Sequence, residues 1–130
     1  MMPLKWMKTT GWILSGLLAV VFIGSAVAKL SGSAMIVKQF GELGLSNQVR
    51  LIGIGELTSA ILFLIPLTHP LGVLLLSSYM GGAILAHMSH GKPYVLQSMF
   101  LVLIWTAGFL RRPQLFLDVP KAKFSPVVEV

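Results

Sequence analysis

Four long apolar segments, separated by short polar connections, constrain the fold of this chain more than any other feature. They run from about Thr10 to Leu30, Leu51 to Leu67, Leu71 to His90 and Tyr94 to Leu110. Each is about 17–21 residues long, and at 1.5 Å per residue such a helix crosses a hydrocarbon core of roughly 30 Å. The pattern predicts an all-α protein with a bundle of four transmembrane helices over residues 1–113.

The composition supports membrane insertion and excludes several other classes. Hydrophobic residues make up 55% of the chain and charged residues 11%, whereas soluble domains contain about 25% charged residues. The net charge is +6, but the ten Lys and Arg residues are scattered between the apolar segments and at the ends, so we predict no nucleic-acid partner. The chain has no cysteine, which excludes disulfides, thiol catalysis and cysteine-bound metals.

The first segment also has the features of a secretory signal peptide. Ala26-Val27-Ala28 matches the small-residue cleavage pattern, and Lys5 and Lys8 would form the positive region before it. However, the uncharged stretch from Thr9 to Ala28 is about 20 residues long, whereas signal-peptide cores have about 7–15. We therefore expect a membrane helix.

The first connection, Ser31 to Arg50, is long enough to hold additional structure. Residues 33–40 predict a short helix capped by Ser33. Its apolar stripe would consist of Met35, Ile36, Phe40 and Leu43. We expect this helix to lie at the membrane interface, or to re-enter and fold back over the bundle.

Three pairs of small residues have the four-residue spacing that lets membrane helices approach closely. They are Gly24 and Ala28, Gly55 and Ser59, and Gly82 and Ala86. We expect these pairs to lie at helix–helix contacts.

Four spans place both termini on the same side of the membrane. Six basic residues lie on that side, namely Lys5, Lys8, Arg111, Arg112, Lys121 and Lys123, and four lie on the other, namely Lys29, Lys38, Arg50 and Lys92. The excess predicts cytoplasmic termini. Residues 114–130 are expected to form a cytoplasmic tail that is partly disordered.

Polar residues within the spans form the candidate site. They are Lys29, Glu56, His87 and Gln97. A charge inside a span costs about 2.5–3.5 kcal/mol on insertion scales, so each such residue is informative. Counting 1.5 Å per residue along the four helices places all four at about 22–25 Å from the terminus side. We predict one polar layer, in which Glu56 pairs with Lys29 or with His87.

Each of these residues also has a purely structural interpretation. Lys29 would be an anchor that extends its ammonium group to the lipid headgroups, and Glu56 would form an ion pair that holds two helices together. His87 and His90 would be interfacial, and Gln97 would form an interhelical hydrogen bond. The spacing of the two histidines suits a metal, but Glu56 is the only acid nearby, so we predict no metal and no cofactor.

Several motifs occur in an order that resembles a known family. They are SAVAKLSG at 25–32, FGELGL at 40–45, GIGEL at 53–57, IPLT at 65–68, GAILAH at 82–87 and a final Arg-Pro. This set resembles the DoxX-like family of small bacterial membrane proteins over about residues 10–113. The resemblance implies a four-helix membrane bundle in the bacterial inner membrane, with Lys29, Glu56 and His87 at the family's polar positions.

The resemblance implies little about activity. The family name comes from a subunit associated with thiosulfate:quinone oxidoreductase, and related vertebrate membrane proteins act as assembly factors for other membrane proteins. A role in thiol redox chemistry does not suit a chain without cysteine.

Three classes of function remain. The first, which we favour, is binding of a lipid, a small amphiphile or a partner membrane protein through the layer of Lys29, Glu56, His87 and Gln97. The second is a membrane subunit of a quinone-linked oxidoreductase, or an enzyme in which Glu56 and His87 act as acid and base on a hydrophobic substrate. The third is conduction of protons or small solutes. The sequence leaves open whether the protein is an enzyme, what partners it has and its oligomeric state.

Overall fold

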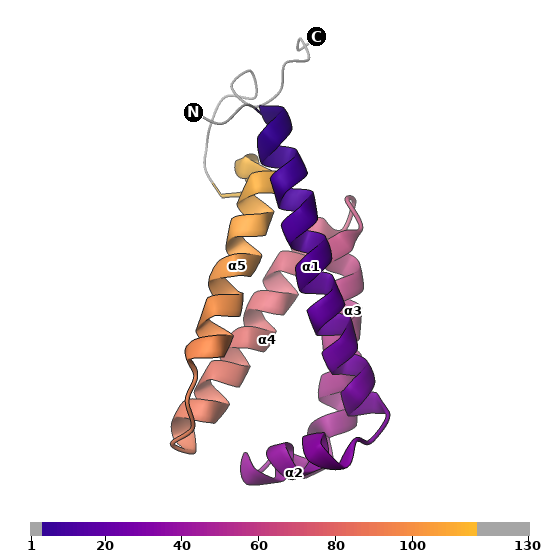
Figure 1. Cartoon of the computed structure of the whole chain (residues 1–130), viewed down its shortest axis with the longest axis vertical. Coiled ribbons are helices and arrows are strands. Elements are labelled where there is room, and N and C mark those ends of the chain that lie inside the picture. The colour runs from indigo at the N-terminus through magenta and orange to yellow at the C-terminus, as the bar shows by residue number, and fades with distance from the viewer. Residues whose placement is uncertain (1–3, 117–130) are drawn as a thin grey trace.

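A computed structural model describes residues 4–116, which are helical with no strand in that range (Figure 1). The α-helices are α1 (Leu4–Leu30), α2 (Ala34–Glu42), α3 (Val49–Leu64), α4 (His69–Ser89) and α5 (Val95–Arg111). Two short 3₁₀ turns, η1 (Ser46–Gln48) and η2 (Pro113–Leu115), are also present in this range. The predicted all-α class is confirmed. Most of the predicted tail, residues 117–130, lies outside the described residues.

The four long helices pack side by side in a ring. Helix α1 lies against α3 and α5, and α4 lies against the same two helices on the opposite side. The start of α1 and the end of α5 lie at one end of the structure, and α2 runs crosswise at the other end (Figure 1). This arrangement brings the far ends of α1 and α4 and the starts of α3 and α5 close to α2.

Two of the helices are long and apolar enough to cross a membrane. They are α1, over Lys5–Leu30, and α4, over His69–Ser89, while α5 is apolar but shorter. Helix α3 has 16 residues and ends at Leu64, earlier than the predicted Leu67. It ends early because Pro66 favours an extended backbone at Ile65, which has ψ 124°.

The predicted short helix is present as α2, with two differences. Ser33 is its N-cap residue, but the Ser33 hydroxyl makes no capping hydrogen bond, so that detail was wrong. Ile36 and Phe40 are half-buried and Leu43 is buried, whereas Met35 is 68% exposed. Ile36, Phe40 and Leu43 are spaced by four and then three residues, so they share one helix face. Met35 precedes Ile36 by one residue and therefore points away from the other helices.

The apolar core lies in the middle of the structure and towards the terminus end. All four long helices contribute to it, through Leu18, Phe22, Ala60, Phe63, Val73, Leu76, Met80, Ile104 and Ala107. These residues come from the terminus-side and central turns of their helices, so the terminus half is tightly packed.

Close helix contacts occur at other glycines than those predicted. A Cβ atom at Gly72 would lie 2.3 Å from Phe63 Cα, where α3 and α4 meet, and one at Gly53 would lie 3.0 Å from Lys29 Cβ, where α1 and α3 meet. The glycines of the three predicted pairs, Gly24, Gly55 and Gly82, have no neighbouring helix within 4 Å of a Cβ position. The expectation was wrong because the spacing of small residues does not determine which helix face is packed.

Candidate functional site

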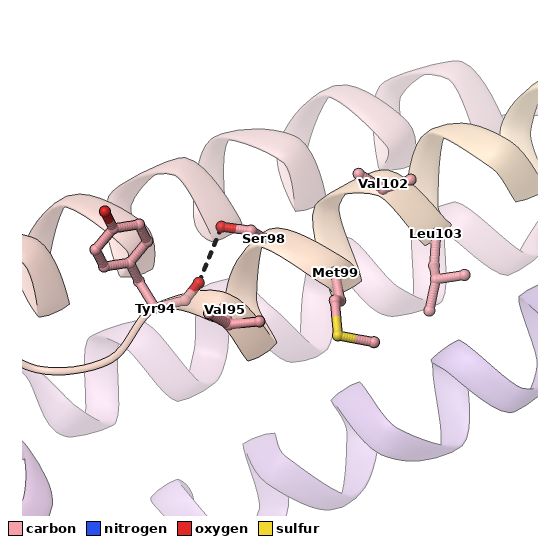
Figure 2. Close-up of a pocket in the computed structure, with 6 residues that line it drawn as sticks. All are labelled: Tyr94, Val95, Ser98, Met99, Val102 and Leu103. Atoms are coloured by element: carbon pink, nitrogen blue, oxygen red, sulfur yellow. Dashed lines mark hydrogen bonds between the residues drawn. The ribbon is translucent and has the colours of Figure 1, made fainter.

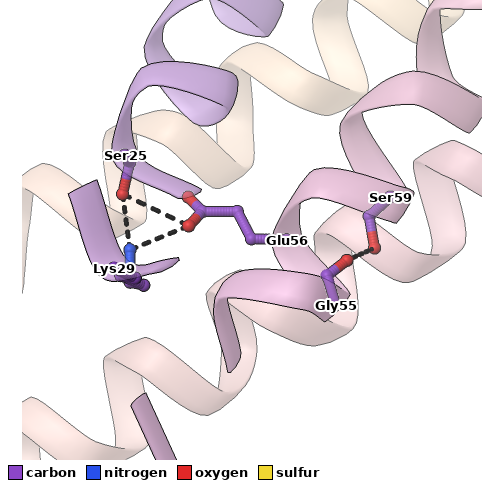
Figure 3. Close-up of polar contacts among 5 residues, drawn as sticks. All are labelled: Ser25, Lys29, Gly55, Glu56 and Ser59. Carbon is purple, nitrogen blue, oxygen red and sulfur yellow. Dashed lines mark hydrogen bonds and ion pairs between the residues drawn. The ribbon is translucent and has the colours of Figure 1, made fainter. Parts of the chain in front are cut away.

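A buried ion pair joins α1 to α3. Lys29 Nζ lies 2.8 Å from Glu56 Oε1, and the two residues are 5% and 1% exposed (Figure 3). The Ser25 hydroxyl donates to the same carboxylate oxygen at 3.2 Å and accepts a hydrogen bond from Lys29. Glu56 therefore pairs with Lys29 and not with His87, and Lys29 is not an anchor in the headgroups.

The local sequence explains why this pair forms. Ser25 and Lys29 are four residues apart, so both lie on the face of α1 that meets α3. Gly53 and Glu56 are three residues apart on α3, and both are buried. Because Gly53 has no side chain, α1 approaches α3 closely at this point, which places the base of the Lys29 side chain over Gly53 and within reach of Glu56.

Two aromatic rings surround the ammonium group on its other sides. Lys29 Nζ lies 5.5 Å from the ring centroid of Phe40 on α2 and 5.8 Å from that of Tyr79 on α4. Ring faces attract cations, and both distances fall within the range of about 6 Å at which this attraction operates. Lys29 is thus contacted by groups from α1, α2, α3 and α4. The depth of Lys29 along its helix had predicted only Glu56 as a contact, with His87 as the alternative partner of Glu56.

Not every polar side chain near the pair is available to a ligand. Ser59 is one turn after Glu56 on α3, but its hydroxyl donates to Gly55 O at 2.6 Å (Figure 3). This bond is internal to α3. Ser59 therefore does not extend the polar layer.

A cavity of about 920 Å³ adjoins the ion pair. Residues from all five helices line it, and all four predicted site residues are among them, namely Lys29, Glu56, His87 and Gln97. Residues from α2, including Ile36 and Phe40, form part of the same wall. The structure therefore brings the four predicted residues together around a single cavity, on the side of the core away from the termini.

The side chains of His87, on α4, and Gln97, on α5, meet in the wall of the cavity. His87 Nδ1 lies 2.8 Å from Ala83 O, and His87 Nε2 lies 3.4 Å from Gln97 Nε2. The interhelical contact expected for Gln97 is present. Its Oε1 is buried and has no hydrogen-bond partner among the described residues.

His90 does not join this group. It is exposed, and its Nδ1 lies 3.0 Å from Ala86 O, one turn earlier on α4. Within residues 4–116 there is no group of three or more acidic or histidine side chains suited to a metal.

A second ion pair connects α2 to the loop between α4 and α5. Lys92 Nζ lies 2.6 Å from Glu42 Oε1, and both side chains are exposed. The hydrogen bond and the positive charge of Lys92 lower the pKa of the Glu42 carboxyl below its ordinary value. Both residues line the cavity, so this pair connects α2 to the loop between α4 and α5 at the edge of the cavity.

The terminus end contains a polar cluster that the sequence did not predict. Arg111 is 5% exposed, and its guanidinium donates to Phe63 O at 2.8 Å, to Leu64 O at 3.2 Å and to Ser15 Oγ at 3.1 Å. The guanidinium carbon also lies 3.9 Å from the Trp12 ring centroid. The sequence analysis counted Arg111 only as a basic residue on the terminus side and did not predict these buried contacts.

The break after α3 explains this cluster. The last carbonyls of a helix lack partners within it, and Pro66, which follows, has no N–H to donate. Arg111 supplies two of the missing donors. Thr68 Oγ1 supplies a third, to Leu62 O at 2.9 Å, and the buried His69 Nδ1 lies 3.0 Å from Phe63 O. Pro66 was the available sequence signal that a distant donor is required here.

An apolar groove of about 410 Å³ follows the outer face of α5 (Figure 2). It is lined by Tyr94, Val95, Ser98, Met99, Val102 and Leu103. The Ser98 hydroxyl already donates to Tyr94 O at 2.9 Å. The groove therefore offers little polar chemistry to orient a ligand, and the larger cavity is the candidate site.

Comparison with known proteins agrees with the sequence motifs. The model of the DoxX-like family matches residues 13–108, a range that includes all four polar site residues. No curated protein and no solved structure matches the chain. Because the family match covers most of the chain and two of its helices are apolar enough to cross a membrane, this protein belongs to the DoxX-like family of membrane proteins.

Proposed function

We propose that this protein is a four-span protein of the bacterial inner membrane that binds a lipid or a small amphiphile in the cavity next to α2. The cavity volume of about 920 Å³ falls within the range of about 300–1,000 Å³ that is typical of ligand sites. Such sites combine apolar walls with a few convergent polar groups. Here the polar groups are the layer of Lys29, Glu56, His87 and Gln97.

The outer surfaces of the shorter helices support four spans. On α3, Leu51 is 70% exposed and Ile54 is 50% exposed, and on α5 Val102 is 64% exposed. In water, apolar surface of this extent would be an aggregation hazard, whereas in lipid it is the surface that is required. Both helices also pack along α1 and α4, which are long enough to span.

The basic residues support cytoplasmic termini. Arg111 and Lys29 are engaged in buried contacts, so they count less as loop charges. Lys5, Lys8 and Arg112 lie at the terminus end in the described part of the chain. Lys38, Arg50 and Lys92 lie at the other end, where Lys92 is paired with Glu42. Lys121 and Lys123 of the tail add to the terminus side.

The observation that carries the proposal is the division of the cavity wall into polar and apolar parts. The ion pair of Lys29 and Glu56 lies next to the apolar side chains of Phe22, Met80 and Phe100, which line the same cavity. A molecule with a polar head and an apolar body matches both parts. A fully polar solute would leave the apolar wall uncovered.

The other functions receive less support. The Glu56 carboxylate already accepts hydrogen bonds from Lys29 and Ser25. An acid–base enzyme would need this same carboxylate to exchange a proton with its substrate. Conduction requires a polar path through the terminus half, where the apolar core is packed. Binding of a partner membrane protein would need a docking surface, and the cavity is concave and partly covered by α2.

Native mass spectrometry of the purified protein tests the proposal. The wild type should retain a discrete additional mass, and Glu56→Gln should lose it, because the change removes the charge that holds Lys29 in the wall. Ser59→Ala is the matched control, because the Ser59 hydroxyl bonds only within α3 and Ser59 does not line the cavity, so this variant should keep the bound mass. If neither the wild type nor the control carries or accepts an amphiphile, the polar layer has only a structural role.

A further inference from the structure

We infer that the cavity selects amphiphiles whose head group is uncharged and donates a hydrogen bond, in the manner of an alcohol, to Gln97 Oε1. This inference rests on the proposed function, because it specifies the ligand of the same cavity. It depends on two observations, which are the orientation of the Gln97 amide and the pairing of the charges around the cavity.

The contacts of His87 fix the Gln97 amide. A backbone carbonyl only accepts hydrogen bonds, so His87 Nδ1, 2.8 Å from Ala83 O, is the ring nitrogen that carries the proton. In the neutral imidazole, Nε2 is then an acceptor. The group of Gln97 that faces it at 3.4 Å must be the NH₂ donor, and this assignment directs Oε1 away from His87.

This orientation leaves an acceptor without a donor. Gln97 Oε1 is buried and lacks a partner among the described residues. Ser98 is the hydroxyl residue next to Gln97 in α5, but it donates to Tyr94 O within its own helix. Buried acceptors are costly when unpaired. Because Gln97 lines the cavity, the head group of a ligand bound there is the candidate donor for this oxygen.

The charges around the cavity disfavour an ionised head group. Among the described residues, the charged side chains that line the cavity are Lys29, Glu42, Glu56 and Lys92. They form two ion pairs, Lys29 with Glu56 and Lys92 with Glu42. A phosphate, carboxylate or ammonium head would enter without a free counter-charge, and an unpaired charge in an apolar site is unfavourable. A hydroxyl group meets the need of Gln97 without this cost.

The test compares three probes with one alkyl chain, namely the primary alcohol, its methyl ether and the corresponding carboxylate. Binding is measured on the whole protein in phosphatidylcholine nanodiscs, with empty nanodiscs subtracted. The alcohol should bind about tenfold more tightly than the ether, the size expected for one net hydrogen bond, and the carboxylate should not exceed the ether. In Gln97→Leu the alcohol and the ether should bind alike.

Ser98→Ala is the matched control, because Ser98 neighbours Gln97 on α5 and its hydroxyl is already used within the helix. This variant should keep the tenfold preference. If the wild type binds the ether as tightly as the alcohol, or the carboxylate most tightly, the head-group rule is wrong while the cavity proposal stands. If no probe binds the wild type, both are wrong. Should Gln97→Leu fail to fold, the wild-type probe series still decides.

Discussion

Lys29 Nζ and Glu56 Oε1 lie 2.8 Å apart in the interior, although 27 positions separate the two residues in the chain. Their contact joins α1 to α3 and forms part of the cavity wall. Each charge is nearly inaccessible to solvent, so each depends on the other for compensation. The pair is therefore both a packing element and the polar part of the candidate site.

A double-mutant cycle measures the coupling energy between Lys29 and Glu56. Lys29→Leu should destabilise the protein by about 3–5 kcal/mol, because Glu56 would remain buried without its partner. Lys29→Leu combined with Glu56→Leu should cost less than the single change, since no charge is left unpaired. Equilibrium unfolding in detergent measures both. Additive effects of the two substitutions would contradict a coupled pair.

Arg111 is predicted to stabilise the end of α3. Arg111→Ala removes the donors to Phe63 O and Leu64 O and should cost at least about 2 kcal/mol. Arg112→Ala is the matched control, because Arg112 is exposed, and it should change stability by about 0.5 kcal/mol or less. Thermal unfolding of the two variants provides the comparison. Equal shifts in melting temperature would contradict a capping role for Arg111.

Gly72 is predicted to be intolerant of any side chain. A Cβ atom there would lie 2.3 Å from both Phe63 Cα and Phe63 N, so Gly72→Ala would force α3 and α4 apart, at a cost of about 3 kcal/mol or more. Gly81→Ala on the same helix meets no neighbouring atom and should be neutral or stabilising by up to about 1 kcal/mol. Unfolding midpoints of both variants provide the comparison. If Gly72→Ala is as stable as Gly81→Ala, the close contact of α3 and α4 at Gly72 is refuted.

Much of this fold follows from periodicity and length. The apolar runs gave the four long helices to within a few residues at most boundaries, and the short helix between the first two was expected from residues 33–40. The errors have identifiable causes. Pro66 ended α3 early, and Lys5 and Lys8, which are good helix formers, allowed α1 to begin at Leu4 rather than Thr10.

The site was predictable only in part. Depth along each helix placed Lys29, Glu56, His87 and Gln97 in one layer, because depth depends on connectivity and helical rise alone. The rotation of each helix does not follow from depth, so the contacts of Lys29 with Phe40 and Tyr79 were missed. Arg111 was missed because a basic residue at a helix end is usually a membrane-interface charge.

The contact between α2 and the loop after α4 should weaken in acid. Lys92 lowers the pKa of Glu42 in the folded protein, first through their hydrogen bond and then through its charge, and Lys38 adds a smaller effect. A lowered carboxyl pKa contributes stability above the ordinary value near 4.5, and this contribution is lost as the pH falls through the lower folded value. The protection of α2 amides against hydrogen exchange, corrected for the pH dependence of the intrinsic exchange rate, should therefore decrease below about pH 4.5.

Glu42→Gln is the control for this pH dependence. The variant lacks the titrating carboxyl, so exchange of α2 should already be faster at neutral pH and should show no additional step in acid. Raised salt should speed exchange of α2 in the wild type, since both partners are exposed. An identical acid step in wild type and variant would assign the transition to another group.

The central claim, that an amphiphile occupies the cavity next to α2, is tested most directly by single-cysteine labelling, because the chain has no native cysteine. Ala86→Cys places a thiol on the cavity wall, and Leu85→Cys places one on the neighbouring outer surface, where Leu85 is 67% exposed. Adding a long-chain alcohol to the purified protein should slow maleimide labelling at position 86 and leave position 85 unchanged. Equal rates with and without the alcohol at position 86, or equal slowing at both positions, would contradict the account.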